Sequence, residues 1–237
     1  MTTNYLLEIS VESADAAVAA ERAGADRIEL CAELNIGGTT PAAELMRDTR
    51  ARVKIPIFAM IRPRGGDFVY SPAELAQMCH DIELAKSSGM DGIVLGVLLR
   101  DNTVDVSATR ELVRSAKPLP VTFHRAFDET SDLSRALQNV IATGATRILT
   151  SGGQPTALAG AAVLNALINS ANQKITILPG GGINPSNLEE IIAATNATEF
   201  HSGLGSSIPY SRSDHSQFER EVSSLSAILK RSVIQKH

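Results

Sequence analysis

The sequence predicts a single-domain (β/α)₈ barrel over residues 1–237, and three observations point to this fold class. Eight short runs of β-type residues recur at intervals of about one strand and one helix, and segments with helical apolar spacing lie between them. A weak internal repeat relates every second unit. Eight such units favour a closed barrel over an open doubly wound sheet, and no shift in composition marks a second domain.

The expected strands follow one another along the whole chain. Apolar and polar residues alternate in several of them, because successive strand side chains point to opposite faces of a sheet. The strands are expected at Tyr5–Ser10, Arg27–Cys31, Ile57–Arg62, Gly92–Val97, Val121–Arg125, Arg147–Ser151, Ile175–Leu178 and Glu199–Ser202.

Helix boundaries are visible between these strands. Ser71-Pro72 and Asp132 are start signals, and Phe218–Leu229 has the apolar spacing of a final helix. Each even-numbered strand follows a Gly or Asn that would end the preceding helix in a left-handed conformation. The four repeat segments are A-G-A-D-R-I-E-L at 23–30, S-G-M-D-G-I-V-L at 88–95, T-G-A-T-R-I-L-T at 143–150 and T-N-A-T-E-F-H-S at 195–202.

Composition and charge argue against two classes of partner. The net charge is −4 and no run of Lys or Arg is present, so we expect no nucleic-acid partner. No segment approaches the roughly 20 apolar residues of a membrane helix, and the N-terminus does not resemble a signal peptide. With only Cys31 and Cys79 as thiols, the chain fits a reducing compartment, and we expect a cytoplasmic protein without a membrane partner.

In such a barrel, function lies at the carboxyl ends of the strands. Alternation directs Leu7 and Ile9 outward toward the helices and leaves polar side chains facing inward. A single inward charge can belong to a buried ion pair that only fills the barrel, but five together at this end favour a site. The expected catalytic residues are Glu8, Glu29, Arg62, His124 and His201.

Glycine-rich turns follow several strands and predict an anion site. Backbone N–H groups in such turns can approach a phosphate or another anion, although the triple glycine can also serve only a tight turn. The turn Gly65-Gly66-Asp67 fits either a lid or an ordinary flexible loop. The expected ligand-binding residues are Arg125, Ser151, Gly180, Gly181, Gly182, Ser202 and Gly203.

The lysines are placed away from this end of the barrel. Lys54, Lys117 and Lys174 precede strands, so a Schiff-base mechanism has no nucleophile. The remaining chemistry is acid–base transfer by carboxylates and histidines, with Arg62 and Arg125 to hold an anion. Strict alternation directs Arg125 outward, so its role depends on where the fifth strand ends.

A metal site is the competing hypothesis. Carboxylates and histidines suit a borderline divalent ion, whereas Cu(I) prefers sulfur, which makes Cys31 the candidate metal ligand. The two candidate sets are Glu8, Glu29, His124 and His201 for a divalent ion, and Cys31, Met60 and His201 for Cu(I).

Four segments are distinctive: M-I-R-P-R-G-G-D-F-V-Y at 60–70, F-H-R-A-F-D at 123–128, I-L-T-S-G-G at 148–153 and L-P-G-G-G-I at 178–183. Together they resemble the CutC family of copper homeostasis proteins, and the resemblance covers nearly the whole chain. It implies a cytosolic (β/α)₈ barrel, usually a homo-oligomer, with a role in copper homeostasis and copper as the suggested metal.

Three functions follow from these observations and stay open at this point. The resemblance implies a copper homeostasis protein. The inward residues favour an enzyme acting by acid–base chemistry on a small anionic metabolite, phosphorylated ones included. A non-catalytic metal-binding protein is the third.

Overall fold

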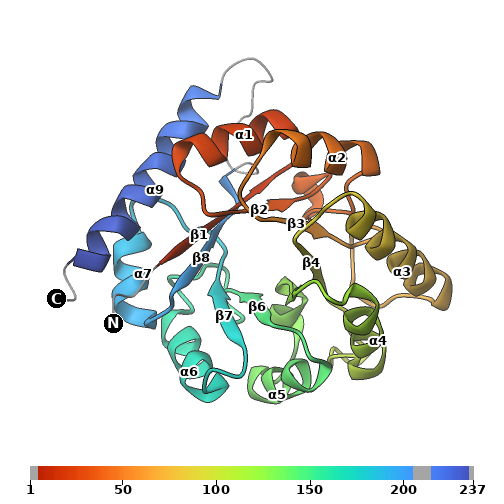
Figure 1. The fold of residues 1–237 in the computed structure, drawn as a ribbon. Coiled ribbons are helices and arrows are strands. Elements are labelled where there is room, and N and C mark those ends of the chain that lie inside the picture. Colours follow the sequence, from red (N-terminus) through yellow and green to blue (C-terminus); the bar gives the residue numbers. More distant parts are fainter. Residues whose placement is uncertain (1–4, 205–214, 235–237) are drawn as a thin grey trace.

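The computed structural model describes residues 5–204 and 215–234. In these ranges eight parallel strands form one sheet, in the order β7-β6-β5-β4-β3-β2-β1-β8. The sheet curves until β7 and β8 adjoin, with helices around the outside (Figure 1). The predicted (β/α)₈ barrel is therefore confirmed.

The strands occupy the positions that the sequence predicts, and every strand end lies within two residues of the predicted one. Their bounds are β1 (Leu6–Val11), β2 (Arg27–Leu30), β3 (Ile57–Met60), β4 (Gly92–Leu95), β5 (Val121–Phe123), β6 (Arg147–Thr150), β7 (Thr176–Pro179) and β8 (Glu199–Ser202).

The helices lie between successive strands and after β8. They are α1 (Ala14–Ala23), α2 (Ala43–Arg52), α3 (Pro72–Ser87), α4 (Val106–Ala116), α5 (Leu133–Thr143), α6 (Ala161–Ala171), α7 (Leu188–Thr195) and α9 (Ser216–Ile234), with 3₁₀ turns η1 (Leu34–Ile36) and η2 (Arg125–Glu129).

The helix boundaries follow the local signals in the sequence. Ser71 begins α3 in a reciprocal capping box with Glu74, and Asp132 caps α5 through its side chain. Three of the four repeats have the predicted effect, since Gly24, Gly144 and Asn196 all end helices at positive φ. In the fourth, Ser88 ends α3 and Gly89 follows it at positive φ.

Five strands end earlier than predicted, and β3, β4 and β5 do so by two residues. β5 stops at Phe123 because the Nδ1 atom of His124 accepts a hydrogen bond from the Ala126 N–H at 3.1 Å and begins η2. β3 stops at Met60, and the Arg62 N–H donates to Thr40 Oγ1 in the loop after β2 instead of continuing the ladder. β4 also stops two residues early, at Leu95, and β2 and β6 each stop one residue early.

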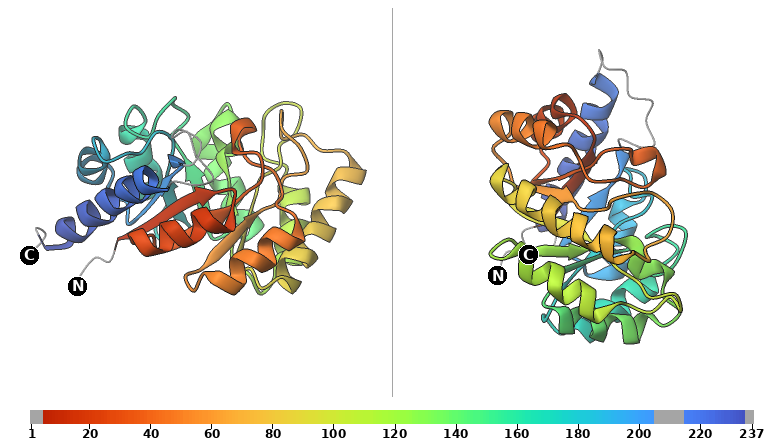
Figure 2. Two further views of the ribbon diagram at one scale, coloured as in Figure 1. Left: turned by 90° about the horizontal axis from the view of Figure 1, so that it is seen from above. Right: turned by 90° about the vertical axis from the view of Figure 1, so that its right-hand side faces the viewer.

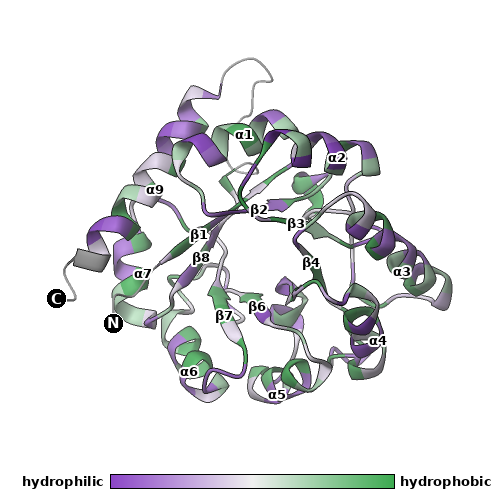
Figure 3. Ribbon diagram, in the orientation of Figure 1, coloured by the Kyte–Doolittle hydropathy of each residue, from purple (hydrophilic) through white to green (hydrophobic). Residues whose placement is uncertain are grey.

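The core has an outer and an inner part. Leu7, Ile9 and Ile28 are fully buried between the sheet and the helices, whereas the barrel interior holds a smaller cluster around Phe58 and Val94. Both apolar and polar colours appear along the strands and the helices (Figure 3). This outer layer leaves the interior positions available to charged side chains.

The ring of helices closes where the first and last described elements meet. Helix α9 packs against α1, α7 and β1, so the first and last described elements lie side by side (Figure 2). No helix within residues 5–204 and 215–234 is long and apolar enough to cross a membrane.

Candidate functional site

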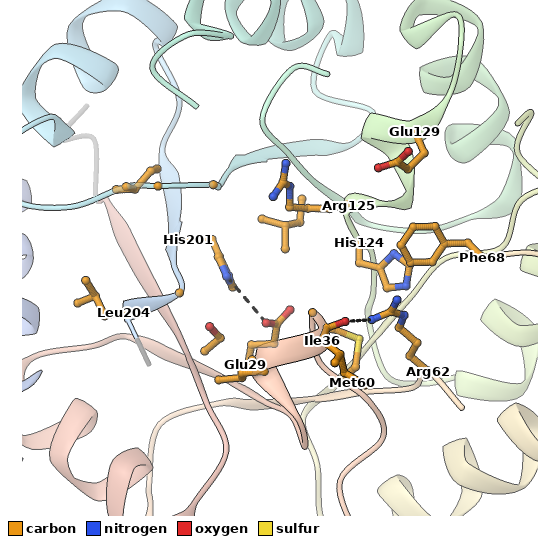
Figure 4. Close-up of a pocket in the computed structure, with 18 of the residues that line it drawn as sticks. Glu29, Ile36, Met60, Arg62, Phe68, His124, Arg125, Glu129, His201 and Leu204 are labelled. Carbon is orange, nitrogen blue, oxygen red and sulfur yellow. Dashed lines mark hydrogen bonds and ion pairs between the residues drawn. The ribbon is translucent and has the colours of Figure 1, made fainter. Parts of the chain in front are cut away.

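A cavity of about 560 Å³ opens at the carboxyl ends of the strands (Figure 4). This volume lies in the range of small-molecule sites. Among the predicted residues, those that line the cavity are Glu29, Arg62, His124, Arg125, Gly181, Gly182, His201 and Gly203. The predicted residues that do not line it are Glu8, Cys31, Ser151, Gly180 and Ser202.

Strand register brings three of the catalytic candidates together. Glu8 pairs in register with Arg27 on β2 and with His201 on β8, and Glu29 is level with Ser10 on β1. His201 Nδ1 lies 2.7 Å from Glu8 Oε1, and its Nε2 lies 3.9 Å from Glu29 Oε2. The imidazole therefore stands between two carboxylates.

Glu8 is held as a carboxylate. Burial alone would raise its pKa, but the Arg27 guanidinium and His201 outweigh burial and lower the pKa of Glu8 to about 2. The Arg27 Nε atom donates directly to Glu8 Oε2. A group with this pKa is a poor proton carrier at neutral pH, so Glu8 orients His201 instead of exchanging protons.

The pKa values of Glu29 and His201 are both shifted upward. Burial raises the pKa of Glu29, against the influence of His201, and Glu8 adds to the rise. Burial opposes the charged form of His201, but Glu29 and Glu8 outweigh it and raise the pKa of His201. The Oε1 atom of Glu29 is buried without a hydrogen-bond partner in the described part of the chain.

His124 is a neutral donor at the other side of the cavity. An amide N–H can only donate, so the bond from Ala126 leaves Nδ1 unprotonated and places the ring proton on Nε2. Burial, with Arg62 nearby, lowers the pKa of His124 to about 3. Nε2 is buried without a partner among the described residues, and the ring packs against Phe68 with centroids 4.9 Å apart.

Arg62 is largely occupied by backbone carbonyls. Its Nη1 atom donates to the oxygens of Ile36 and Gly38 at 3.0 Å each, and Nη2 donates to Gly66 O at 2.9 Å. Its guanidinium also lies 4.9 Å from the centroid of the Phe68 ring. Arg62 thus joins the loops after β2 and β3, and its Nε is buried without a partner in residues 5–204 and 215–234. The Gly65-Gly66-Asp67 turn is tied to the barrel by this bond.

Arg125 faces the cavity because β5 has already ended before it. Its Nε donates to Asp128 Oδ2 at 2.9 Å and its Nη2 to Ser151 Oγ at 3.0 Å. A Cβ atom placed at Gly181 would lie 3.5 Å from Arg125 Cζ, so the guanidinium contacts the glycine turn after β7. The side chain is fixed with one edge toward the cavity.

The other predicted anion-binding groups have partners within the protein. The Ser151 N–H donates to Asp128 Oδ2, and the Ser202 hydroxyl donates to Ile183 O at 2.7 Å. The Gly180 N–H donates to Thr150 O. Gly203 lines the cavity. These groups shape the loops around the site.

Three residues with clear structural roles were missed by the sequence prediction. Arg27 stands two positions before Glu29, so the alternation that directs Glu29 inward also applies to Arg27. Asp128 and Phe68 lie outside the strands, where periodicity carries no information. Of the three, only Arg27 could have been predicted from the alternation of strand side chains.

Copper fits the sulfur-containing part of the site poorly. Cys31 and Met60 are neighbours, since a Cβ at Gly38 would lie 3.2 Å from Cys31 Sγ and 3.5 Å from Met60 Cε. Cu(I) binds thiolate, however, and burial together with Glu29 raises the pKa of the Cys31 thiol well above its usual range. The thiol instead hydrogen-bonds to Glu29 Oε2 at 3.6 Å.

One group of side chains in the described ranges has the proximity that a metal ion requires. Ligand atoms of Glu8, Glu29 and His201 lie within 4.8 Å of one another. Arg27 and the His201–Glu8 hydrogen bond already satisfy Glu8, so an ion would have to displace one of them. This geometry fits a charge-paired triad better than a ligand set.

Comparison with known proteins agrees with the fold and the motifs. The CutC family model matches residues 5–206. A human copper homeostasis protein cutC homolog is 48% identical over 197 residues, which cover 83% of this chain and 72% of that protein. A family protein CutC from Chromobacterium violaceum is 46% identical over 196 residues, 83% of this chain and 79% of that protein.

A solved structure shows the same architecture. The putative copper homeostasis protein CutC from Streptococcus agalactiae superposes with a TM-score of 0.79 at 33% sequence identity, covering 84% of this chain and 98% of that chain. The family match spans the eight strands and every residue of the cavity described above. The chain therefore belongs to the CutC family.

Proposed function

We propose that this protein is an enzyme that acts by acid–base chemistry on a small anionic molecule bound in the cavity. One observation carries the proposal: two buried polar atoms of opposite character, Glu29 Oε1 and His124 Nε2, lack partners in the described chain although both residues line the same cavity. Leaving such atoms unpaired is costly, and in a barrel mouth a ligand is the natural partner.

Each residue has a distinct role in this proposal. Glu29 is the base, because its raised pKa brings proton affinity closer to neutral pH. His201 exchanges protons with Glu29, and Glu8 orients His201. Arg125 holds the anionic group at the edge of the cavity.

The copper role in the names of the relatives is a separate proposal for this chain. A protein that delivers copper needs sulfur ligands that deprotonate readily, and the buried Cys31 thiol does not meet that requirement. The metal role of Cys31 stays a prediction, and the donor set favours the enzyme.

We also propose a cytoplasmic homo-oligomer. The chain has two cysteines, and the structure has both of them as free thiols, which suits a reducing compartment. The oligomeric state follows from the family resemblance alone and is accessible to light scattering.

The proposal is tested by comparing turnover in the wild type with turnover in Glu29→Gln, which lacks the proposed base. Small phosphates and carboxylates are screened by thermal shift, where a ligand at 100 times its Kd stabilises by roughly 2.7 kcal/mol. Conversion of the molecules that stabilise the protein is then measured by NMR. We expect the wild type to convert at least one of them, and Glu29→Gln to lose about 100-fold or more in rate.

Glu111→Gln, on the exposed face of α4, is the matched control and should keep full activity. If Glu29→Gln turns over the same compound at the wild-type rate, or if no anionic compound is converted by the wild type, the proposed function is wrong.

A further inference from the structure

The glycine turn after β7 presents unpaired hydrogen-bond donors to the cavity wall. Gly181 and Gly182 both line the cavity at positive φ, and their N–H groups donate to nothing in residues 5–204 and 215–234. Arg125 Nη1 would lie 3.6 Å from a Cβ at Gly181, and within the described chain it likewise makes no hydrogen bond. Three donors, one of them cationic, therefore lie together at this edge.

The loop after β6 presents no comparable site, because the protein fills it with its own carboxylate. Asp128 accepts from the N–H groups of Ser151 and Gly153 at 3.0 and 2.9 Å. A substrate anion is thereby directed to the β7 turn. Asp128 and Ser151 also fix two of the three nitrogens of Arg125, so its third nitrogen is held in place before a ligand arrives.

Deeper in the cavity lie one hydrogen-bond acceptor and one donor that have no partner among the described residues. Glu29 and His124 point into the same space, with Arg125 near its rim (Figure 4). Glu29 offers a buried acceptor atom and His124 a buried donor, and each lacks a partner among the described residues. A carbonyl group next to an acidic C–H bond satisfies both at once: its oxygen accepts from His124, and its neighbouring carbon gives a proton to Glu29.

Other reaction classes lack the groups that they need. No lysine or cysteine is among the described residues that line the cavity, so a covalent imine or thioester has no nucleophile there. The hydroxyls of Ser151 and Ser202 are committed to backbone carbonyls. Proton abstraction requires no nucleophile.

We infer that the substrate is a small phosphorylated carbonyl compound, with its phosphate on Arg125, Gly181 and Gly182, its carbonyl oxygen on His124 Nε2, and its acidic C–H bond toward Glu29. This inference rests on the proposed function and names its substrate class and reaction. The C–H bond breaks, its electron pair forms a C=C bond, and the carbonyl becomes an enolate oxygen held by the His124 N–H. The proton on Glu29 returns to the carbon skeleton, so atoms and electrons balance without a further reactant.

Phosphate binding is tested with inorganic phosphate, followed by calorimetry. We expect Arg125→Gln to weaken binding about tenfold or more, because a charge-assisted donor is lost. Arg100→Gln is the matched control, since Arg100 is an exposed arginine in the loop after β4 and does not line the cavity. Equal affinities for acetate and phosphate, or equal losses in both variants, would overturn the phosphate assignment.

The reaction is tested by deuterium exchange. Phosphorylated aldoses and ketoses of three to six carbons are incubated with the protein in D₂O, and incorporation beside the carbonyl is measured by NMR. We expect exchange with the wild type, a loss of about 100-fold in Glu29→Gln, and a smaller loss in His124→Asn, which keeps an acceptor for the Ala126 N–H but lacks the Nε2 donor. Phosphate affinity should be unchanged in His124→Asn.

Two outcomes separate this inference from the proposed function. If panel members bind but incorporate no deuterium, or if none binds although inorganic phosphate does, the phosphorylated carbonyl class is wrong. The proposed function fails only if no anionic compound of any class is converted, or if Glu29→Gln is fully active.

Discussion

His124 shows how a single residue receives its chemistry from its surroundings. As the last residue before η2 it uses Nδ1 to accept the Ala126 N–H, so only Nε2 remains for a ligand. Burial beside Arg62 then removes the charged form at physiological pH. The residue is a fixed hydrogen-bond donor, unlike an exposed histidine whose charge changes near neutral pH.

The lowered pKa of His124 makes stability depend on pH. The unfolded chain protonates this histidine below its usual pKa of 6.5, whereas the folded protein resists protonation until about pH 3. Its contribution to stability is therefore present above pH 6.5 and is lost as the pH falls from 6.5 toward 3.

From pH 7 to pH 5 we expect the wild type to lose about 2 kcal/mol more unfolding free energy than His124→Asn, measured by urea denaturation. His80→Asn, on the exposed face of α3, should instead follow the wild type. Parallel pH curves for the wild type and His124→Asn would show that the imidazole is accessible to protons in the folded state.

The segment from β5 through η2 organises the mouth of the barrel as an element. Its early strand end turns His124 and Arg125 toward the cavity, and Asp128 reaches across to the loop after β6. The Asp128 carboxylate accepts hydrogen bonds from Thr150 Oγ1 at the end of β6 and from the Ser151 and Gly153 N–H groups in the loop after it. One side chain thus positions two loops.

Removing this carboxylate should loosen the loop. We expect Asp128→Ala to cost about 1–3 kcal/mol of unfolding free energy, since several buried donors lose their acceptor. Hydrogen exchange of the Ser151 and Gly153 amides should speed up selectively. Asp132→Ala, which removes only the cap of α5, should cost about 1 kcal/mol and leave these two amides protected. Unchanged exchange in Asp128→Ala would contradict the role of this carboxylate.

At the scale of the whole molecule, a charged network fills the barrel beneath the cavity. Arg27 donates to Glu8 and, through Nη2, to Glu199 at 2.7 Å, while Arg147 Nε donates to Glu199 at 3.0 Å. Both guanidinium groups lie about 5 Å from the Phe58 ring centroid, at 5.0 Å for Arg27 and 4.9 Å for Arg147. The network joins β1, β2, β6 and β8, and Glu8 connects it to His201 at the site.

For a buried ion pair of this kind, we expect the changes in unfolding free energy of the two single variants to be strongly non-additive. Arg27→Met leaves Glu8 as an uncompensated buried charge and should cost about 3–5 kcal/mol of unfolding free energy. The double variant with Glu8→Gln should recover much of that loss, because the charge is removed together with its partner. A denaturant-based double-mutant cycle measures the difference, and additive losses would contradict the direct pairing of Arg27 with Glu8.

Much of the architecture can be predicted from local sequence signals. Local signals such as the capping residue Ser71 and the helix-ending Gly24 set the element boundaries, and alternation identified Glu8, Glu29 and His201 as interior residues. These features depend on neighbours within a few positions of the chain, so they can be predicted from the sequence alone. The fold class followed from the same local signals.

The roles of the interior residues depended on the tertiary structure. Alternation gives the face of a residue but not its partner, and the stagger between strands aligned Glu8 with both Arg27 and His201. The same reason explains why Arg62, expected to hold an anion, instead donates to carbonyls from two loops, and why Asp128 occupies the loop after β6. Alternation along a strand is a local property, and it predicts that Glu8, Glu29 and His201 face the interior. Their partners depend on packing between residues far apart in the chain. That packing pairs Glu8 with Arg27 and His201 and leaves Glu29 Oε1 and His124 Nε2 without a partner among the described residues.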